Sequence, residues 1–474
     1  MTWVADQTRL SKSGYDFIDD THLHELLDCR VGAAEVREVI AKSMSREALS
    51  VEEAAVLLAA EEPGLLEPIF DAARRLKREV YGDRIVLFAP LYVGNECTND
   101  CVYCAFRRSN RQTVRRTLDE EELRAQVAAL LGRGHKRLVL VFGEHRRYNP
   151  RFIADCVRQV YAVRQGREAI RQVNVNAAPL DHEGFAAVKA AGIGTYQVVQ
   201  ETYHHDTYAR VHPTGTRKND YLWRLDGPGR AIESGCGDVG LGALFGLYDW
   251  RFEVLGLVRH GLHLQQHYGV GPRTVSFPRL RPAGGVGLDD AYVASDGEFK
   301  RLIAVMRLAM PYTGLVLAAR EPRPLRREVT ALGVSQIDVG SPIELGGDAE
   351  GDGSGAAGGG PMPPGEPRPL DDVLRDLMVD GYLPSFCTAC YRLGRTGEHF
   401  TELAAAGFIQ RFCTPNALAT LMEYLTDYGS RETYEAGKRL IEEELARLPD
   451  GDRKRELMDR WRRIRETEER DVHF

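Results

Sequence analysis

Long apolar runs are missing from this sequence. No stretch approaches the ~20 consecutive apolar residues that a membrane-spanning helix needs, and the first twenty residues lack the apolar core of a secretory signal. Neither sign of charge dominates the sequence. The 62 lysines and arginines and the 69 aspartates and glutamates give a small formal net charge of −7. We therefore expect no membrane span and no nucleic-acid partner, and we expect the reducing cytoplasm as the compartment.

Cysteine is scarce, and it is unevenly placed. The 474 residues contain nine cysteines, of which six fall into two groups of three. The first group has the spacing CxxxCxxC and consists of Cys97, Cys101 and Cys104. The second is a CxxC pair followed by another cysteine after twenty-two residues, and consists of Cys387, Cys390 and Cys413. The isolated cysteines, expected to be ordinary buried thiols, are Cys29, Cys156 and Cys236.

The first group resembles the motif of the radical S-adenosylmethionine (SAM) enzymes. Iron–sulfur cysteines usually come in fours, so a triad can hold a cubic 4Fe–4S cluster with one iron open. In those enzymes the open iron chelates SAM, and an electron from the cluster yields a 5'-deoxyadenosyl radical. The adenine rests at the aromatic residue before the last cysteine, here Tyr103. Zinc, which favours CxxC pairs and a fourth ligand, and disulfides, which favour secreted chains, fit this spacing less well.

Helical and strand-like periods alternate along the chain. Residues 1–80 carry apolar residues at helical spacing, and short β-branched runs then alternate with amphipathic stretches. Eight such units over about 250 residues predict an α/β fold, a (β/α)8 TIM barrel with helical N-terminal and C-terminal extensions; a doubly wound open sheet is the alternative. The predicted strands are 85–88, 138–142, 173–176, 195–199, 239–243, 274–277, 315–318 and 334–339.

The same patterns divide the chain into four parts. We expect a helical extension over 1–80, the barrel over 81–345, a Gly/Pro-rich flexible loop over 346–369 and a helical region over 370–474 that carries the second cysteine group. The predicted barrel helices lie near 120–132, 152–164, 182–191, 219–234, 250–267, 298–309 and 322–332.

Polar residues follow several predicted strands, where barrel active sites lie. Gly143 would let the backbone approach a ligand, and the carboxylate of Glu144 suits the amino group of SAM. Asn176 ends the third strand, and Glu201 follows the fourth. Arg320, after the seventh strand, is a candidate clamp for a substrate carboxylate, with a structural salt bridge as the alternative. We expect all of these side chains to face one cavity.

The second cysteine group allows two interpretations from its spacing alone. It predicts either a zinc site, with His399 as a fourth ligand, or another cluster with one iron free. Three histidines, His260, His263 and His267, lie late on the helix after the fifth strand. That position places them near the bottom of the barrel, away from the SAM-binding mouth.

Taken together, these motifs closely resemble the HydG family, the tyrosine lyases of FeFe-hydrogenase maturation. The likeness runs from about residue 20 to about residue 430, and the C-terminal triad distinguishes this family from the related thiazole-pathway tyrosine lyase (2-iminoacetate synthase). Two features depart from the pattern: the Gly-rich insert at 346–360, and Arg273 where histidine is expected. The segments that carry the resemblance are 97–104 (CTNDCVYC), 200–204 (QETYH), 239–248 (VGLGALFGLY), 269–272 (GVGP), 278–279 (PR), 333–336 (GVSQ) and 381–387 (GYLPSFC).

The resemblance implies a two-site enzyme. A SAM-derived radical acts on L-tyrosine, the Cα–Cβ bond breaks, and p-cresol and dehydroglycine form, with Glu201 and Arg320 as the residues expected at the substrate and Glu201 also at SAM. Dehydroglycine then yields carbon monoxide and cyanide at a second, auxiliary cluster that carries an extra iron bridged by free cysteine, for which His263 is the expected ligand. The implied partners are a flavodoxin or ferredoxin-like reductant and a hydrogenase maturation scaffold protein.

Overall fold

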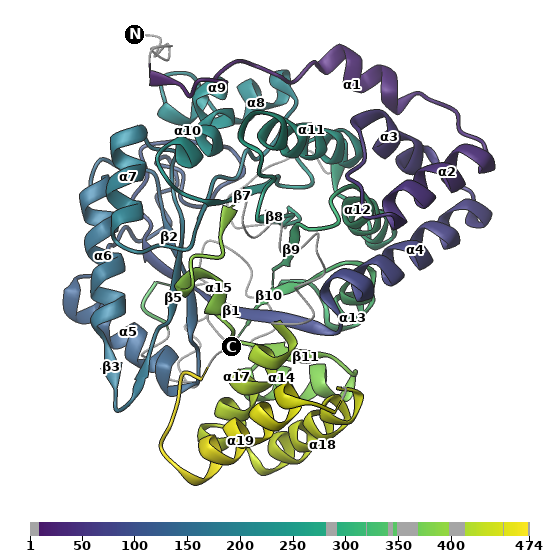
Figure 1. Ribbon diagram of the computed structural model, residues 1–474. Coiled ribbons are helices and arrows are strands. Elements are labelled where there is room, and N and C mark those ends of the chain that lie inside the picture. The colour runs from purple at the N-terminus through teal and green to yellow at the C-terminus, as the bar shows by residue number, and fades with distance from the viewer. Residues whose placement is uncertain are drawn as a thin grey trace.

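Eight parallel strands close into a barrel at the centre of the molecule (Figure 1). The computed structural model describes residues 9–280, 292–318, 320–339, 345–347, 368–397, 413–448 and 450–472. The strand order is β10, β9, β8, β7, β6, β5, β2, β1, and β10 pairs again with β1, so the predicted barrel is confirmed and the open sheet is excluded. The barrel strands are β1 (Arg84–Gly94), β2 (Arg137–Phe142), β5 (Gln172–Asn176), β6 (Thr195–Gln197), β7 (Asp238–Gly242), β8 (Thr274–Ser276), β9 (Gly314–Leu317) and β10 (Gln336–Asp338).

Helices cover the outside of the barrel between successive strands (Figure 1). The single helix predicted over 219–234 is wrong, because that segment divides into α9 (Tyr221–Leu225) and α10 (Gly227–Glu233). Pro228 lacks the N–H that a continuous helix would use, so the helix restarts there. The short α8 (His205–Val211) was not predicted. The other helices match their predicted positions: α5 (Glu120–Gly132), α6 (Pro150–Ala162), α7 (His182–Ala190), α11 (Trp250–Tyr268), α12 (Asp296–Ala309) and α13 (Arg323–Leu332).

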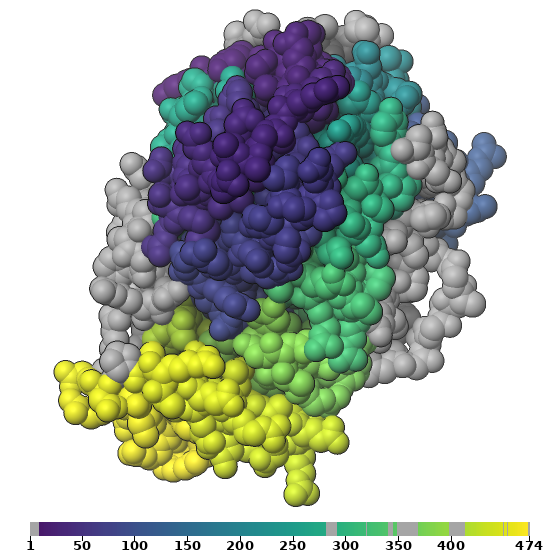
Figure 2. Space-filling model, turned by 90° about the vertical axis from the view of Figure 1, so that its right-hand side faces the viewer, coloured from purple at the N-terminus to yellow at the C-terminus, as the bar shows by residue number. Residues whose placement is uncertain are grey.

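The N-terminal extension is helical and lies against one side of the barrel. Figure 2 shows it in purple and blue, above the yellow lobe of C-terminal helices. Its four helices are α1 (Asp20–Leu27), α2 (Ala33–Met44), α3 (Val51–Ala59) and α4 (Pro63–Tyr81). Across the described ranges, no helix has both the length and the hydropathy to cross a membrane.

The C-terminal region is mostly helical, but it also adds a strand that the sequence does not predict. β11 (Leu383–Ser385) pairs in parallel with Arg84–Val86 of β1, because β2 joins β1 only from Ala89 onward and leaves that edge free. Pro384 sits within this strand, and proline is tolerated at a sheet edge. The other C-terminal elements are α14 (Leu370–Val379), α15 (Ala389–Arg392), α17 (Thr414–Asp427), α18 (Arg431–Arg447) and α19 (Asp452–Glu466), and a two-stranded hairpin joins β3 (Arg164–Gln165) to β4 (Glu168–Ala169). Most of the predicted Gly/Pro-rich loop, and His399, lie outside the described residues.

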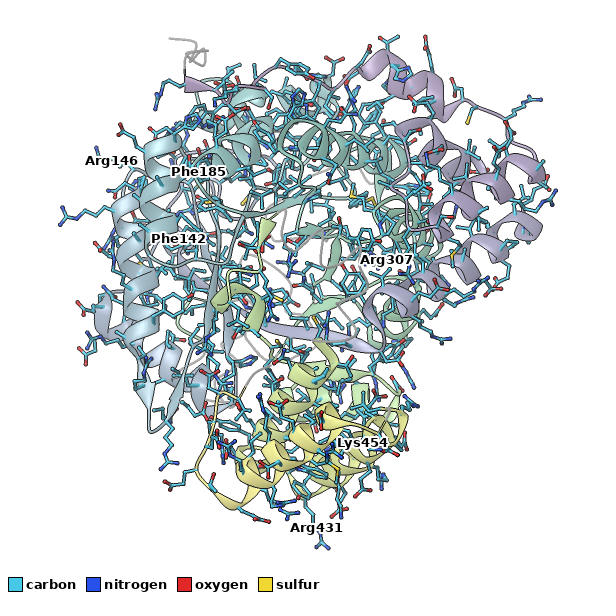
Figure 3. All side chains as sticks on the ribbon, viewed as in Figure 1. Phe142, Arg146, Phe185, Arg307, Arg431 and Lys454 are labelled. Carbon is cyan, nitrogen blue, oxygen red and sulfur yellow. The ribbon has the colours of Figure 1, made fainter. Side chains whose placement is uncertain are left out.

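The core between strands and helices is apolar, and a buried arginine ties two of its loops. Phe185 of α7 packs edge-on against Tyr196 of β6, with ring centroids 4.8 Å apart (Figure 3). Arg307 of α12 is fully buried and donates hydrogen bonds to the backbone carbonyls of Pro311, at 2.9 Å, and Gly333, at 2.8 Å. These bonds satisfy carbonyls of the segments that lead into β9 and β10.

Side chains alternate between the inside and the outside of the barrel along β1. Arg84 and Val86 line a cavity at the strand's first residues, and Phe88 packs with Val139 of β2 and Val316 of β9 in a small apolar cluster. The same two-residue period continues to Tyr92 near the end of the strand. At about 3.3 Å per residue, β1 carries inward-facing side chains over roughly 26 Å, from one end of the barrel to the other.

A buried carboxyl group on α11 fixes the chain just beyond β6. Glu253 is fully buried, accepts a hydrogen bond from the Thr202 hydroxyl, and accepts another from the Tyr203 backbone N–H at 2.8 Å. Burial raises the pKa of Glu253 to about 8, so the group is mostly protonated at neutral pH. Since Thr202 follows Glu201 directly, these bonds set the direction in which Glu201 leaves the strand.

Replacing Glu253 tests this buried group through the pH dependence of stability. The folded pKa of about 8 lies above the reference value of 4.5, so between these values the folded protein holds the extra proton and its free energy of unfolding falls as pH rises. The loss across this window is on the order of 4 kcal/mol. Glu253→Gln keeps both hydrogen-bonding positions and does not titrate, so its melting temperature should fall less between pH 5 and pH 8. Anaerobic thermal unfolding by circular dichroism measures this, and equal slopes for both proteins would contradict it.

Candidate active site

The first cysteine group lies in the loop after β1, at the end of the barrel where the strands finish. Cys101 is buried in an apolar cluster with Val211 and Leu247, whereas Cys97 and Cys104 are half-buried. Burial raises the pKa of Cys101 to about 11 and that of Cys104 to about 12. Metal coordination requires thiolates, so loading this site with iron would release protons.

Residues after β2 hold the cysteine loop in place. Thr98 donates from its backbone N–H to the Glu144 carbonyl at 2.8 Å, and Asn99 donates from Nδ2 to the Glu144 carboxylate at 2.8 Å. Gly143 has to be glycine, because a Cβ there would lie 2.3 Å from the carbonyl oxygen of Glu96, next to the first cysteine. The Gly143-Glu144 pair therefore anchors the loop and also presents a carboxylate beside it.

Two carboxylates share two cations next to the cysteines. Lys218 donates to Glu201 at 2.6 Å, and Arg224 lies 3.8 Å from Glu144 and 3.9 Å from Glu201. Arg224 is itself fixed by a hydrogen bond from Nε to the Val199 carbonyl at 2.7 Å. Glu201 has a positive φ of 77°, a backbone conformation that residues other than glycine rarely adopt. The structure thus brings Glu144 and Glu201 together in a position where each can receive an ammonium or hydroxyl group.

Tyr103 is oriented by a buried histidine. His212 donates from Nδ1 to the Tyr208 carbonyl at 2.9 Å, so its Nε2 accepts from the Tyr103 hydroxyl at 2.8 Å. Burial lowers the pKa of His212 to about 2, which keeps the imidazole neutral and able to accept. The Lys218 ammonium lies 5.5 Å from the centre of the Tyr103 ring. Tyr103 is therefore held rigidly beside the cysteines and the carboxylate pair.

Arg320 reaches the inside of the barrel mouth from the end of β9. Its guanidinium hydrogen-bonds the side chain of Tyr92, whose pKa is raised by burial and is also influenced by Cys104. Arg320 and the cysteine loop therefore approach the same inward-facing tyrosine. A guanidinium in this position can bind a carboxylate through two parallel hydrogen bonds.

Asn176 and Glu321 differ in where the structure places them. Asn176, half-buried at the end of β5, lies in register with Val141 of β2 and Gln197 of β6, at the height of the barrel mouth. Glu321, the neighbour of Arg320, is buried in an ion pair with Arg279 and does not face the mouth cavity. The ion pair orients the segment after β9 and uses the Glu321 carboxylate.

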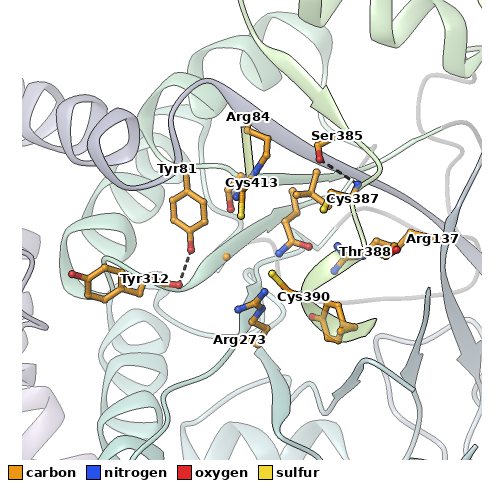
Figure 4. A pocket seen from close by; sticks show the side chains of 15 residues that line it. Tyr81, Arg84, Arg137, Arg273, Tyr312, Ser385, Cys387, Thr388, Cys390 and Cys413 are labelled. Atoms are coloured by element: carbon orange, nitrogen blue, oxygen red, sulfur yellow. Dashed lines mark hydrogen bonds between the residues drawn. The ribbon is translucent and has the colours of Figure 1, made fainter. Parts of the chain in front are cut away.

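The second cysteine group lies at the opposite end of the barrel. Its three cysteines line one cavity of about 600 Å³, together with residues at the first positions of β1, β2, β9 and β10 (Figure 4). Cys387 lies two residues after the end of β11, and its backbone N–H donates to the Ser385 hydroxyl at 3.3 Å. Cys390 lies on α15, and Cys413 immediately precedes α17. Pairing of β11 with the start of β1 therefore carries this group to the bottom of the barrel.

Three arginines line the same cavity: Arg84, Arg137 and Arg273. Burial raises the pKa of the Cys387 thiol, and the guanidiniums of Arg84 and Arg137 act against this rise. Burial would lower the pKa of Arg273, but Asp238, whose carboxylate lies 3.7 Å from Arg273 Nε, raises it above its usual value. The ring of Tyr391 lies 5.7 Å from the guanidinium of Arg137 and 5.7 Å from that of Arg273. The cavity is thus cationic as well as rich in sulfur.

The structure does not bring His263 to this cavity. His263 stacks on Phe17 of the N-terminal segment with ring centroids 3.9 Å apart, and His260 faces Tyr203, whose hydroxyl lies 2.9 Å from its Nδ1. At 100° per residue, His260, His263 and His267 form one stripe of α11, and none of the three lines the cavity of the cysteines. The expectation that His263 is a ligand at the second cluster is therefore corrected.

Each end of the barrel offers three cysteines, the number that a cubic cluster with one open iron uses. Within the described ranges, no three His, Cys, Asp or Glu side chains are grouped as ligands of a single metal ion. A cubic cluster needs a different arrangement, because each of its cysteines binds a different iron. At the mouth, the open iron of such a cluster would lie beside the Glu144 and Glu201 carboxylates. At the bottom, the described lining offers no imidazole or carboxylate to a further iron.

Several residues of both sites escape prediction from the sequence. Lys218, Arg224 and His212 belong to helices or turns after β6, and they meet the cysteines only because the barrel closes. Arg84 and Arg137 directly precede the predicted strands 85–88 and 138–142, and an arginine next to a strand is usually interpreted as an exposed end. The alternation of side chains along β1 and β2 was the signal available in the sequence, because it places both arginine side chains inside the barrel.

Comparison with known proteins agrees with this arrangement. The model of the Radical SAM superfamily matches residues 91–253, and that of the Biotin and Thiamin Synthesis associated domain matches residues 276–383. The Radical SAM superfamily implies a 4Fe–4S cluster and SAM. The 2-iminoacetate synthase of Escherichia coli (strain K12) is 36% identical over 312 residues, which cover 66% of this chain and 81% of that protein.

Solved structures extend the likeness to nearly the whole chain. A crystal structure of HydG, a maturase of the FeFe-hydrogenase, is 42% identical with a TM-score of 0.92, covering 97% of this chain and 100% of that chain. HydG from Carboxydothermus hydrogenoformans, also an FeFe-hydrogenase maturase, is 38% identical with a TM-score of 0.78, covering 90% and 94%. This chain therefore belongs to the HydG family of radical SAM lyases.

Proposed function

We propose that the protein is a tyrosine lyase that acts in FeFe-hydrogenase maturation. It would cleave the Cα–Cβ bond of L-tyrosine to p-cresol and dehydroglycine, and dehydroglycine would give carbon monoxide and cyanide at a second iron–sulfur cluster. The observation that carries the proposal is the location of two cysteine triads at opposite ends of one barrel. A plain tyrosine lyase needs the upper triad alone, so the lower triad favours the two-step activity over thiazole synthesis.

The upper site has a group for each part of the first reaction. Cys97, Cys101 and Cys104 would hold the cluster, which supplies the electron that splits SAM. Glu144 and Glu201 offer carboxylates to SAM, and Asn176 lies at the same height. Tyr103, held by His212, is the platform expected for the adenine. The positive φ of Glu201 is consistent with a functional role, since strained backbone tends to occur at such sites.

Arg320 is the proposed clamp for the tyrosine carboxylate. It lies inside the mouth against Tyr92, and a guanidinium binds a carboxylate in a fixed fork. With the carboxylate fixed, the amino group of tyrosine can be directed toward the radical. Exclusion of water by the apolar shell around Cys101 would protect the radical from side reactions.

The lower site would receive dehydroglycine through the barrel. Cys387, Cys390 and Cys413 would hold the second cluster, and enclosure would protect an imine that hydrolyses in bulk water. Carbon monoxide and cyanide would leave for a hydrogenase maturation scaffold protein, and a flavodoxin or ferredoxin-like protein would supply electrons in the cytoplasm. The first experiment is an anaerobic assay of reconstituted protein with SAM, dithionite and tyrosine, measuring p-cresol and carbon monoxide together. Cresol without carbon monoxide would favour the thiazole-pathway activity.

Cys97→Ala should abolish both products. Loss of a ligand of the upper cluster removes the electron source for SAM cleavage, so 5'-deoxyadenosine, p-cresol and carbon monoxide should all fall to background. Liquid chromatography measures the first two, and carbon monoxide is trapped with haemoglobin. Cys29→Ala, in the N-terminal extension, is the matched control and should retain activity. Retained p-cresol in Cys97→Ala would refute the assignment of the upper triad.

Cys387→Ala should separate the two steps. The upper site is intact, so p-cresol should continue to form, while carbon monoxide falls to background because the lower cluster has lost a ligand. Iron analysis by mass spectrometry should show a loss of about four irons per chain. Zinc in the wild-type protein, released by this substitution, would instead support a structural zinc site. Parallel loss of both products in a variant with a normal circular dichroism spectrum would argue against separate sites.

Arg320→Lys should weaken tyrosine binding. Lysine keeps the charge but loses the bidentate fork, so the KM for tyrosine should rise by about tenfold or more, equivalent to at least ~1.4 kcal/mol. Steady-state p-cresol formation at several tyrosine concentrations measures this. Arg323→Lys is the control, because Arg323 is exposed and pairs with Asp376 at 2.8 Å on the surface. An unchanged KM for Arg320→Lys would remove Arg320 from the substrate site.

A further inference from the structure

The cavity at the bottom of the barrel is surrounded by positive charge. Arg84 and Arg137 are buried, with 8% and 4% of their surfaces exposed, and both line the cavity with the three cysteines. The Nε atoms of these two arginines have no hydrogen-bond partner among the described residues. Buried guanidinium groups normally have all their N–H groups satisfied, so unused donors at a cavity indicate a ligand that accepts hydrogen bonds.

Arg273 completes this set from the segment before β8. Its backbone N–H donates to the Val239 carbonyl at 2.8 Å and its carbonyl accepts from Gly314 at 3.0 Å, so its position is fixed on both sides. Asp238 lies 3.7 Å from its Nε and also accepts from the Gly397 backbone N–H at 2.9 Å. Arg273 also lines a second cavity of about 710 Å³ that opens beside the first. It therefore lies at the boundary of the two cavities.

The charge balance favours an anion over a further metal ion. A cubic cluster in its oxidised form with three thiolates carries about one net negative charge and Asp238 adds another, while the three guanidiniums carry three positive charges, which leaves about one positive charge. A carboxylate would reduce the remaining positive charge, whereas a ferrous ion would add to it. A further iron also needs nitrogen or oxygen ligands, and the described lining has neither an imidazole nor a carboxylate. The residues present therefore do not fit an extra iron held by histidine.

We infer that this cavity binds a small carboxylate directly against the open iron of the lower cluster, with Arg273 as the residue that selects an anion in place of an additional iron. The ligand class is a two-carbon imino or oxo acid, whose carboxylate a guanidinium can hold in its fork. This inference rests on the proposed function, because dehydroglycine is such an acid. The inference adds to the proposed function that the lower cluster of this chain contains four irons and holds no additional iron.

Glyoxylate, the stable oxo analogue of dehydroglycine, is the probe for the anion site. The protein would carry Cys97→Ala, Cys101→Ala and Cys104→Ala, so that only the lower cluster gives an electron paramagnetic resonance signal. Titration with sodium glyoxylate should shift the g-values of the reduced cluster in a saturable way. Arg273→Gln should weaken this response by about tenfold or more, and Arg273→Lys by less. A spectrum that glyoxylate leaves unchanged in the parent protein would overturn the inference.

Iron content tests the exclusion of a further metal ion. After reconstitution with excess iron, sulfide and cysteine, the same protein should hold about four irons per chain, without a high-spin ferrous site in its Mössbauer spectrum. Arg273→His should gain one iron, because it removes a charge and adds an imidazole. About five irons in the parent protein would overturn the inference, and their loss in His399→Ala would identify the ligand. Four irons in Arg273→His would show that Arg273 is not the excluding residue.

Wild-type p-cresol production separates this inference from the proposed function. If wild type makes p-cresol but glyoxylate has no effect on the lower cluster, the anion site fails and the lyase stands. If glyoxylate binds but no p-cresol forms from tyrosine, the anion site stands and the lyase fails. The glyoxylate titration and iron count of the parent protein need no substitution in the cavity, so they hold even where an Arg273 variant fails to fold.

Discussion

Backbone pairing along β1 holds both cysteine groups to one rigid strand. The last residues of β1 lead into the loop that carries Cys97, while its first three residues pair with β11, which leads into Cys387. Hydrogen bonds to β10 and β2 close the barrel around the same strand, so neither group can move relative to the other without breaking the sheet. The strand thus fixes the separation of the two proposed reactions, and its inward-facing side chains line the barrel interior between them.

The two ends of the barrel differ in the net charge of the side chains that line them. At the mouth, the carboxylates Glu144 and Glu201 are balanced by Lys218 and Arg224, which leaves acceptors positioned near a cluster and close to neutral in sum. At the bottom, three guanidiniums surround the cysteines, and within the described part of the chain the carboxylate beside them is that of Asp238. A barrel interior has low dielectric, so these charges act strongly on whatever binds. The difference suits a zwitterionic ligand at one end and an anionic one at the other.

Prediction from sequence succeeds where a pattern is local and periodic. The eight strands were located because β-branched runs recur between amphipathic stretches, and the closed barrel follows from their number. The helix over 219–234 was wrong because Gly227-Pro228 breaks it, a signal that the apolar period masked. β11 could not be found, since three residues that include Pro384 become a strand only by using the free edge of β1.

The residues of the two sites also divide into those that a local pattern predicts and those that tertiary contacts alone bring together. Gly143 and Glu144 could be named because they directly follow a predicted strand, but Lys218 and Arg224 are brought to the site by tertiary folding alone. His263 was placed at the bottom of the barrel from its position along α11, but which way it faces depends on Phe17, far away in the sequence, against which it stacks. The position of a residue along the length of a helix can be predicted from sequence spacing, whereas the direction in which its side chain points depends on the elements packed against that helix.

Burial of the upper cysteines has a consequence for the protein before it receives iron. The thiolate is the form that reacts with oxidants and with disulfides, and the raised pKa values of Cys101 and Cys104 keep both sulfurs protonated at neutral pH. In the metal-free chain these two thiols therefore react slowly with oxidants and with disulfides. A newly made molecule can wait for its cluster with these thiols intact.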